Sequence, residues 1–169
     1  MKQIKKSFVK KKTGHTKKAF KELKNPQTIK SLLLISNSSD QSLKKKVEEL
    51  FSAASVYHLF PREIKEDSTT GFYYSVHKSD FNLTGKLKND KLSNLEDMKV
   101  DLLVDLSSDS ELLNYFVSRV QAGLKVGDIN SNKVVFYDLL VEFEASDNQN
   151  AEIIFHHLNN FTQHAIEQV

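Results

Sequence analysis

Two long apolar runs, each followed by a polar loop and a helical pattern, constrain the fold of this chain more than any other feature. Residues 29–36 read IKSLLLIS and residues 100–107 read VDLLVDLS. Such runs are typical of strands that are buried on both faces of a parallel sheet. Apolar residues then recur at helical spacing over 42–54 and over 111–122. These strand–helix units predict an α/β fold, a mostly parallel Rossmann-like sheet with helices on both faces.

Further strands and one long helix complete the predicted domain. We expect strands at 55–60, 72–77, 124–126 and 134–142, a helical turn at 92–98 and a last helix at 150–168. Gly123 is expected to end the helix at 111–122 as its C-terminal cap. The strand at 100–106 should be central and covered on both faces. Its residues that we expect to be inaccessible to solvent are Leu102, Leu103, Val104 and Leu106.

The length of the chain bounds its domain organisation. A chain of 169 residues fits one folded domain. We assign residues 27–169 to a single α/β domain and residues 1–26 to a basic N-terminal arm. The arm is predicted to be helical over 2–12 and 16–24. Asn25-Pro26 should end the second of these helices.

Charge is divided unevenly between the arm and the rest of the chain. Residues 1–24 contain ten Lys and one acid, Glu22, so they carry +9, whereas the whole chain carries +2 and the remainder −7. A block of one sign is typical of a tail that binds a polyanion. Lysines without arginine favour contact with a nucleic-acid backbone over reading of bases. The lysines that we expect to contact RNA are Lys5, Lys6, Lys10, Lys11, Lys12, Lys17, Lys18 and Lys21.

Two other roles for the arm stay open at this point, a solvated extension and a contact with an anionic membrane surface. The apolar residues Ile4, Phe8 and Val9 offer little area for insertion, so a membrane is the least favoured partner. RNA, ribosomal RNA included, is the expected partner of the arm. A protein partner for the acidic body is also left open.

Several function classes lack the residues that they need. The absence of Cys removes disulfides, thiolate nucleophiles and Cys-based metal sites. The basic N-terminus is not followed by the apolar stretch of a signal peptide, and no run approaches the roughly 18–20 apolar residues of a membrane span. We therefore expect a cytoplasmic protein. The loop at 36–40 has no Gly and the chain has no GxxxxGK[ST] motif, so we expect no dinucleotide or nucleotide cofactor.

Polar residues stand where two predicted strands end and helices begin. Hydroxyl and N–H groups at such places can hold a small anion, and the same residue types cap helices. We favour capping and keep the anion site as an alternative. The residues of that alternative site are Asn37, Ser38, Ser107 and Asp109.

The remaining polar and aromatic candidates favour structural roles. Asp101 and Asp105 share one face of a strand, but a rise of about 3.3 Å per residue separates them by about 13 Å, too far for one site. We interpret Asp105 as a cap or loop anchor. His156, His157 and His164 lack the spacing of a metal site. Aromatic side chains that we expect to be in the core or half-buried, rather than stacked on bases, are Tyr57, Phe72, Tyr73 and Tyr74. Without a nucleophile motif, we expect no enzyme and no metal.

Residues 101–127, DLLVDLSSDSELLNYFVSRVQAGLKVG, together with FYDLL at 136–140, resemble a family of small Bacteroidota proteins of unknown activity. In that family a D-L-(L/I)-(I/V)-D-L-S strand precedes a helix, an A-x-x-K-V-G turn and a Y-D-L-M-I strand. The segment SDFNLTGKL at 79–87 is also similar, although Thr84 replaces an aromatic residue of the family. The resemblance extends over residues 29–165, is strongest over 80–142, and implies a fold without an activity.

A wider resemblance connects the strand at 100–107, the following helix and GLKVG with the acceptor half of heptosyltransferase-type GT-B glycosyltransferases. Those enzymes need a second Rossmann-like domain for the nucleotide-sugar, and this chain is too short to include one. The resemblance therefore implies an α/β fold and argues against transferase activity.

Taken together, these patterns favour a non-catalytic accessory protein whose basic arm contacts RNA, with the ribosome as one place of action. The first alternative is a degenerate glycosyltransferase-like domain that binds a small ligand at the strand ends. The second is a peripheral membrane protein held by the basic arm.

Overall fold

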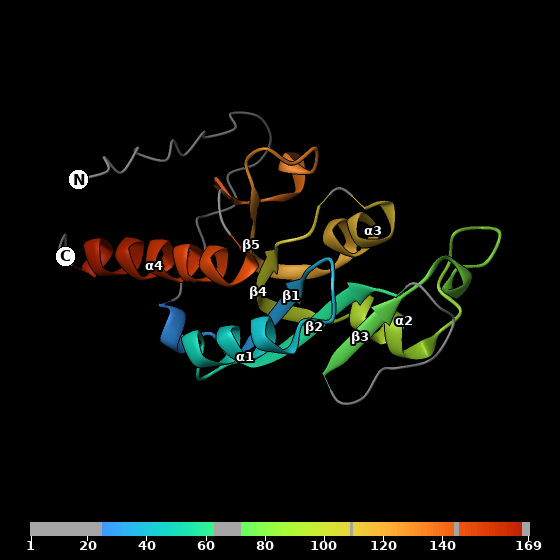
Figure 1. The fold of residues 1–169 in the computed structure, drawn as a ribbon, viewed down its shortest axis with the longest axis horizontal. Helices are drawn as coiled ribbons and strands as arrows, with labels where there is room; N and C mark the ends of the chain where they lie inside the picture. The colour runs from blue at the N-terminus through green and yellow to red at the C-terminus, as the bar shows by residue number, and fades with distance from the viewer. Residues whose placement is uncertain (1–24, 63–71, 109, 144–145, 167–169) are drawn as a thin grey trace.

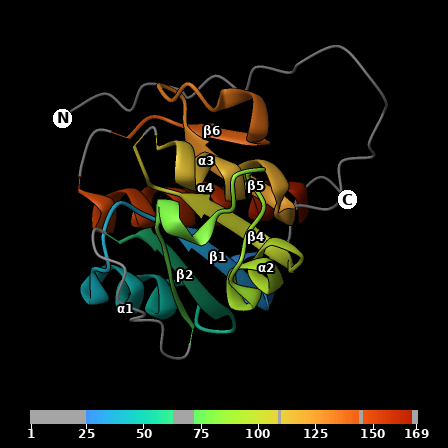
Figure 2. The same cartoon turned by 90° about the vertical axis from the view of Figure 1, so that its right-hand side faces the viewer.

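A computed structural model describes residues 25–62, 72–108, 110–143 and 146–166 of the chain. Its centre is a six-stranded sheet with all strands parallel, in the order β3-β2-β1-β4-β5-β6. Figure 2 shows β2, β1, β4, β5 and β6 following one another across this sheet. The predicted mostly parallel α/β sheet is confirmed. The strands are β1 (Ser31–Ile35), β2 (Ser55–Pro61), β3 (Tyr73–Val76), β4 (Lys99–Asp105), β5 (Gln121–Asp128) and β6 (Leu139–Val141).

Helices cover both faces of the sheet. The helices are α1 (Gln41–Leu50), α2 (Asp90–Glu96), α3 (Glu111–Arg119) and α4 (Asp147–Ile166), with short 3-10 turns η1 (Pro26–Thr28), η2 (Lys78–Asp80) and η3 (Val134–Phe136). Leu43 of α1 and Ile154 of α4 pack with Leu34 on one face. Leu95 of α2 and Phe116 of α3 pack on the other face. Figure 1 shows these two helical layers with the sheet between them.

The strand β4 is central, as its apolar sequence predicts. It pairs with β1 on one side and with β5 on the other. The four apolar residues expected to be inaccessible, Leu102, Leu103, Val104 and Leu106, are all buried. Leu102 and Val104 face the layer of α1 and α4, whereas Leu103 faces α2 and α3.

The prediction that Gly123 caps a helix was wrong. Helix α3 ends at Arg119 and the chain continues directly as β5, so Gly123 lies inside a strand. A Cβ at Gly123 would lie 2.8 Å from the carbonyl oxygen of Asp101. The absence of a side chain therefore allows β5 to approach β4 closely.

The predicted strand at 134–142 is divided in the structure. Residues Val134–Phe136 form η3, and only Leu139–Val141 pair with β5. Between them, the Asp138 carboxylate accepts a 2.9 Å bond from the Lys125 backbone N–H and fixes the entry into β6. Local apolar content alone does not reveal this side-chain bond, so the sequence reads as one strand.

The predicted helical arm lies outside the described residues, as do the eight lysines expected to contact RNA. Of the other predicted elements, the turn at 92–98 overlaps α2, which ends at Glu96, and the last helix overlaps α4, which begins at Asp147. Among the described helices, none combines the length and the apolar character that crossing a membrane would require.

Candidate functional site

The candidate site is the edge of the sheet where β1 and β4 end. The strand order runs one way from β1 through β2 to β3 and the other way from β4 through β5 to β6. In open α/β sheets, ligands bind at the carboxyl ends of the strands beside such a reversal. The described segments that form this edge are residues 36–40 after β1 and residues 106–108 after β4.

A buried polar network is centred on Asp105, the last residue of β4. Its Oδ2 accepts bonds from Lys133 Nζ (2.8 Å) and Tyr137 OH (2.5 Å). Its Oδ1 accepts bonds from the Ser107 backbone N–H (2.9 Å) and hydroxyl (2.6 Å). Lys133 Nζ also donates to Ser107 Oγ, at 3.1 Å. We name Asp105, Ser107, Lys133 and Tyr137 the Asp105 network.

The burial of the Asp105 network decides what it can do chemically. Asp105 is 1% and Lys133 2% exposed, so this ion pair is removed from water. Both carboxylate oxygens accept two protein donors each, which balances the buried charge. A carboxylate surrounded in this way is poorly placed to accept a proton from a ligand or to bind a cation. The geometry assigns Asp105 the role of an anchor for the segments at 107–108 and 133–137.

Gly127 allows Tyr137 to reach Asp105. A Cβ at Gly127 would lie 2.3 Å from Cζ of the Tyr137 ring, well inside van der Waals contact. The ring therefore lies flat against the backbone of β5, and its hydroxyl is directed to the end of β4. Any side chain at Gly127 would displace the ring from this position.

On the β1 side, Asn37 closes the edge by bonding to the segment after β4. Its Oδ1 accepts from the Ser108 backbone N–H (3.1 Å) and hydroxyl (2.9 Å). The two polar segments that could enclose a ligand are thus tied to each other. Of the four residues predicted for a small-anion site, Asn37 and Ser107 lie at this edge and Ser38 is exposed. Asp109 lies outside the described residues.

The groups that would hold an anion are used within the protein. The backbone N–H and hydroxyl of Ser107 donate to Asp105, and those of Ser108 donate to Asn37. At the start of α1, Asp40 occupies the N-terminus and accepts from the Ser42 N–H at 2.8 Å. A carboxylate stands where a pyrophosphate would sit in a dinucleotide-binding fold. The anion site stays a prediction, with few donors left to support it.

A second carboxylate lies close to the start of α1. Burial, followed by the negative charge of Asp40, raises the pKa of Asp147 in the first turn of α4. The N-termini of α1 and α4 therefore present acidic rather than anion-binding character. Among the described residues, no group of three His, Asp or Glu side chains is arranged to hold a metal ion.

His58 of β2 forms a further buried contact at this edge. The Ser36 hydroxyl donates its proton to the Ser38 carbonyl (2.8 Å), so His58 Nε2 must donate to Ser36 Oγ (2.7 Å). Its Nδ1 is buried and accepts no hydrogen bond. Burial, with a smaller effect of the Lys44 charge, lowers the pKa of His58 to about 4. His58 is therefore neutral at pH 7.

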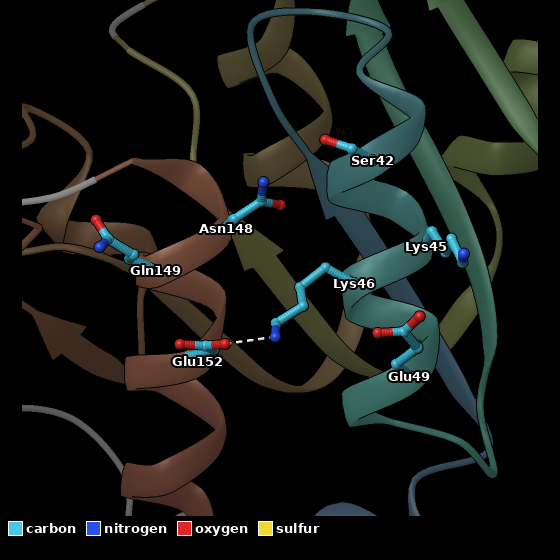
Figure 3. Close-up of a pocket in the computed structure, with 7 residues that line it drawn as sticks. All are labelled: Ser42, Lys45, Lys46, Glu49, Asn148, Gln149 and Glu152. Carbon is cyan, nitrogen blue, oxygen red and sulfur yellow. Dashed lines mark ion pairs between the residues drawn. The ribbon is translucent and has the colours of Figure 1, made fainter.

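The hollow between α1 and α4 has a volume of about 280 Å³ and lies on the surface (Figure 3). The residues around it are polar or charged, although much of the surface that they present is aliphatic, and Lys46 of α1 forms an ion pair with Glu152 of α4 across it. The hydrogen bond and charge of Glu152 raise the pKa of Lys46. The hollow is the space between two surface helices that an ion pair links, so its presence does not require a ligand.

Sequence reasoning placed Asp105 and Ser107 at the strand end but missed Lys133, Tyr137 and His58. Lys133 stands among polar residues of a connection, and Tyr137 lies inside an apolar run that was taken for a strand. One signal for Tyr137 was present in the sequence: Gly127 and Tyr137 both lie in the segments that carry the family resemblance. Asp101, at the other end of β4, accepts from the backbone N–H groups of Lys30 (2.9 Å) and Ser31 (3.2 Å).

The predicted core aromatics lie mostly as expected. Tyr74 is buried, and Tyr57 contacts Phe72 edge-to-face with ring centroids 5.0 Å apart. Tyr73 is partly covered by Lys44, whose Nζ lies 5.0 Å from its ring centroid. Phe72 is the most exposed of the four and is about half-buried.

The fold and this edge define an α/β domain of Rossmann strand order whose carboxyl edge is closed by its own side chains. The chain belongs to a family of unknown function, DUF6913, whose model matches residues 2–160. No curated protein and no solved structure matches the chain significantly.

Proposed function

We propose that this protein is a non-catalytic RNA-binding protein that holds its partner through the basic residues 1–24. The observation that carries the proposal is the division of charge, +9 in residues 1–24 against −7 in the remainder. Lysines that neutralise phosphates release condensed counterions, which provides affinity without sequence preference. The family model begins at residue 2, so it includes the basic segment together with the α/β domain.

The carboxyl edge of the sheet is poorly suited to bind phosphate groups, which favours residues 1–24 as the contact for RNA. Asp105, Ser107, Ser108 and Asn37 bind one another across this edge. Asp40 and Asp147 add negative charge close to the helix N-termini. An acidic, internally bonded edge is unfavourable for the phosphate groups of a nucleotide cofactor and leaves the basic segment as the favoured contact for a polyanion.

The proposal extends to the partner RNA, the location and the relatives of the protein. The RNA includes ribosomal RNA, which would make the protein ribosome-associated and cytoplasmic. The chain is related to the small Bacteroidota proteins that its motifs resemble. The likeness to the acceptor half of GT-B glycosyltransferases is a distant kinship of fold, compatible with the parallel sheet and without transferase activity.

The test measures binding of the full chain to a labelled single-stranded RNA of about 30 nucleotides while salt is varied. Six engaged lysines predict a slope of log K against log salt of about −4, at about −0.7 per contact. The variant replaces Lys10, Lys11, Lys12, Lys17 and Lys18 by Gln, and it should lose about 3.5 of that slope. A scrambled RNA should compete equally well, since lysine reads charge.

The control replaces the same five lysines by Arg. Because the charge is retained, the Arg variant should bind RNA with a similar salt slope. An unchanged affinity and slope in the Gln variant would show that these lysines are not the RNA contact.

A further inference from the structure

The connection between β3 and α2, taken with the first two residues of α2, concentrates positive charge on an otherwise acidic domain. Residues 77–91 contain four Lys and two Asp, although residues 25–169 together carry −7. One of the two acids, Asp80, is already neutralised by Arg62, whose guanidinium lies 2.7 Å away. The connection therefore presents a local excess of positive charge on the side of the molecule that projects at the right in Figure 1.

Three of these lysines have no ion-pair partner among the described residues. Lys78, Lys86 and Lys88 are exposed, and no described carboxylate lies within 4.0 Å of their ammonium groups. The Lys88 ammonium instead donates to the Ser79 carbonyl at 3.2 Å. By contrast, the described cations that are paired with acids are Lys44, Lys46, Arg62, Arg119 and Lys133. The three lysines are thus available to an anionic partner.

The turn that presents these lysines is braced by hydrogen bonds. Asn82 Oδ1 accepts from Thr84 N–H (2.9 Å), Thr84 Oγ1 (2.7 Å) and Lys86 N–H (2.9 Å). The Asn82 N–H donates to the Lys86 carbonyl, and Gly85 has the positive φ of 75° that closes the turn. A braced turn loses little conformational entropy on binding, which favours its use as a contact.

The base of the turn is fixed to the domain. Asp80 Oδ2 accepts from the His77 N–H at 2.8 Å, and the Asp80 carbonyl accepts from the Lys88 N–H at 2.8 Å. Phe81 packs edge-to-face against Tyr115 of α3, with ring centroids 5.0 Å apart. The lysines therefore keep a constant position relative to the sheet.

Leu83 occupies the tip of the turn and is fully exposed. An apolar side chain among unpaired lysines fits a partner that offers both phosphates and uncovered base faces. The bases of single-stranded RNA have such faces, whereas those of a duplex are covered by stacking.

We propose that Lys78, Lys86, Lys88 and Leu83 form a second RNA contact, which binds single-stranded RNA together with residues 1–24. This contact rests on the proposed function, because it gives the same RNA a second attachment on the folded domain. Two attachments on one strand raise the effective concentration of each for the other.

The test compares two full-length triple variants on the single-stranded RNA described above. In the first, Lys78, Lys86 and Lys88 are replaced by Gln. In the matched control, three exposed lysines elsewhere, Lys30, Lys45 and Lys99, are replaced by Gln, with the same loss of charge. The three turn lysines add to the six of residues 1–24, so the wild-type slope should be about −6 at about −0.7 per contact. The first variant should reduce the magnitude of the slope by about 2, and the control should leave it unchanged. Thermal unfolding of both variants verifies that they fold.

The variant Leu83→Ser tests the apolar part of the contact, because it changes no charge. It should weaken binding of the single-stranded RNA several-fold without altering the salt slope, and it should leave binding of a duplex of equal length unchanged. A loss of slope in this variant, or an equal effect on the duplex, would contradict an apolar contact with bases.

The outcomes separate this contact from the proposed function. If the arm variant loses binding while both triple variants match the wild type, the second contact is wrong and the proposed function stands. If only the variant of Lys78, Lys86 and Lys88 loses binding, these lysines form an RNA contact and the arm does not. If the wild type binds no RNA, both are wrong, and the exposed lysines would be left to an acidic protein partner.

Discussion

At the scale of single residues, the ion pair between Asp105 and Lys133 carries the largest expected effect on stability. Lys133→Met leaves a buried carboxylate with only uncharged donors, which typically costs about 3–5 kcal/mol of unfolding free energy. The double variant Asp105→Asn with Lys133→Met removes both charges, so it should be less destabilised than the sum of the single variants. Urea unfolding measures all three. The solvent-accessible ion pair of Lys46 with Glu152 supplies a control, since Lys46→Met should destabilise the fold far less than Lys133→Met.

His58 makes stability depend on pH. Its pKa is lowered from 6.5 to about 4 in the folded protein, so the unfolded chain binds the extra proton first as pH falls. Stability is therefore unaffected above about pH 6.5 and is lost progressively down to pH 4, by about 3 kcal/mol at most at 1.36 kcal/mol per unit of pKa. Urea unfolding at several pH values should show a smaller loss in His58→Gln than in the wild type. His156→Gln, which alters an exposed histidine, should retain the full loss.

At the scale of elements, two glycines hold β5 in place for different reasons. Gly123 lets β5 approach the backbone of β4, and Gly127 makes room for the Tyr137 ring. We expect Gly127→Ala to destabilise the fold by about 1–3 kcal/mol, because the ring must move and its bond to Asp105 is lost. In a Tyr137→Ala background the same change should cost much less, since the ring is absent. Chemical denaturation of this double-mutant cycle measures the coupling. Additive effects would show that Gly127 acts through its backbone alone.

At the scale of the whole molecule, the charge of the arm and the stability of the domain should be independent. Residues 1–24 are dominated by ten Lys, so we expect them to contribute little apolar area to the core. The variant with Gln at Lys10, Lys11, Lys12, Lys17 and Lys18 should therefore unfold within about 0.5 kcal/mol of the wild type, as surface changes usually do. Urea unfolding measures this difference. A larger change would mean that the basic segment packs on the domain, and any loss of RNA binding would then need a structural explanation.

The sequence by itself determined the class of fold and its centre. A run such as VDLLVDLS has apolar residues on both faces, Leu102 and Val104 on one and Leu103 on the other. Its middle must therefore be buried between two helical layers, which places β4 centrally. Helical spacing likewise located α1 and α3, since amphipathic periodicity is a local property. The sequence also located the division of charge, which needs no structure to be counted.

Only the tertiary structure decided how the carboxyl edge is built. The Asp105 network joins residues 28 and 32 positions apart, and Asn37 meets Ser108 across 71 positions. Nothing local in the chain distinguishes Lys133 from a solvated lysine, or Gly123 from a helix cap, because their roles depend on which strand lies beside them. The same reason explains why the sequence alone does not distinguish Lys78, Lys86 and Lys88 from other solvated lysines. Their lack of acidic partners is a property of the folded surface.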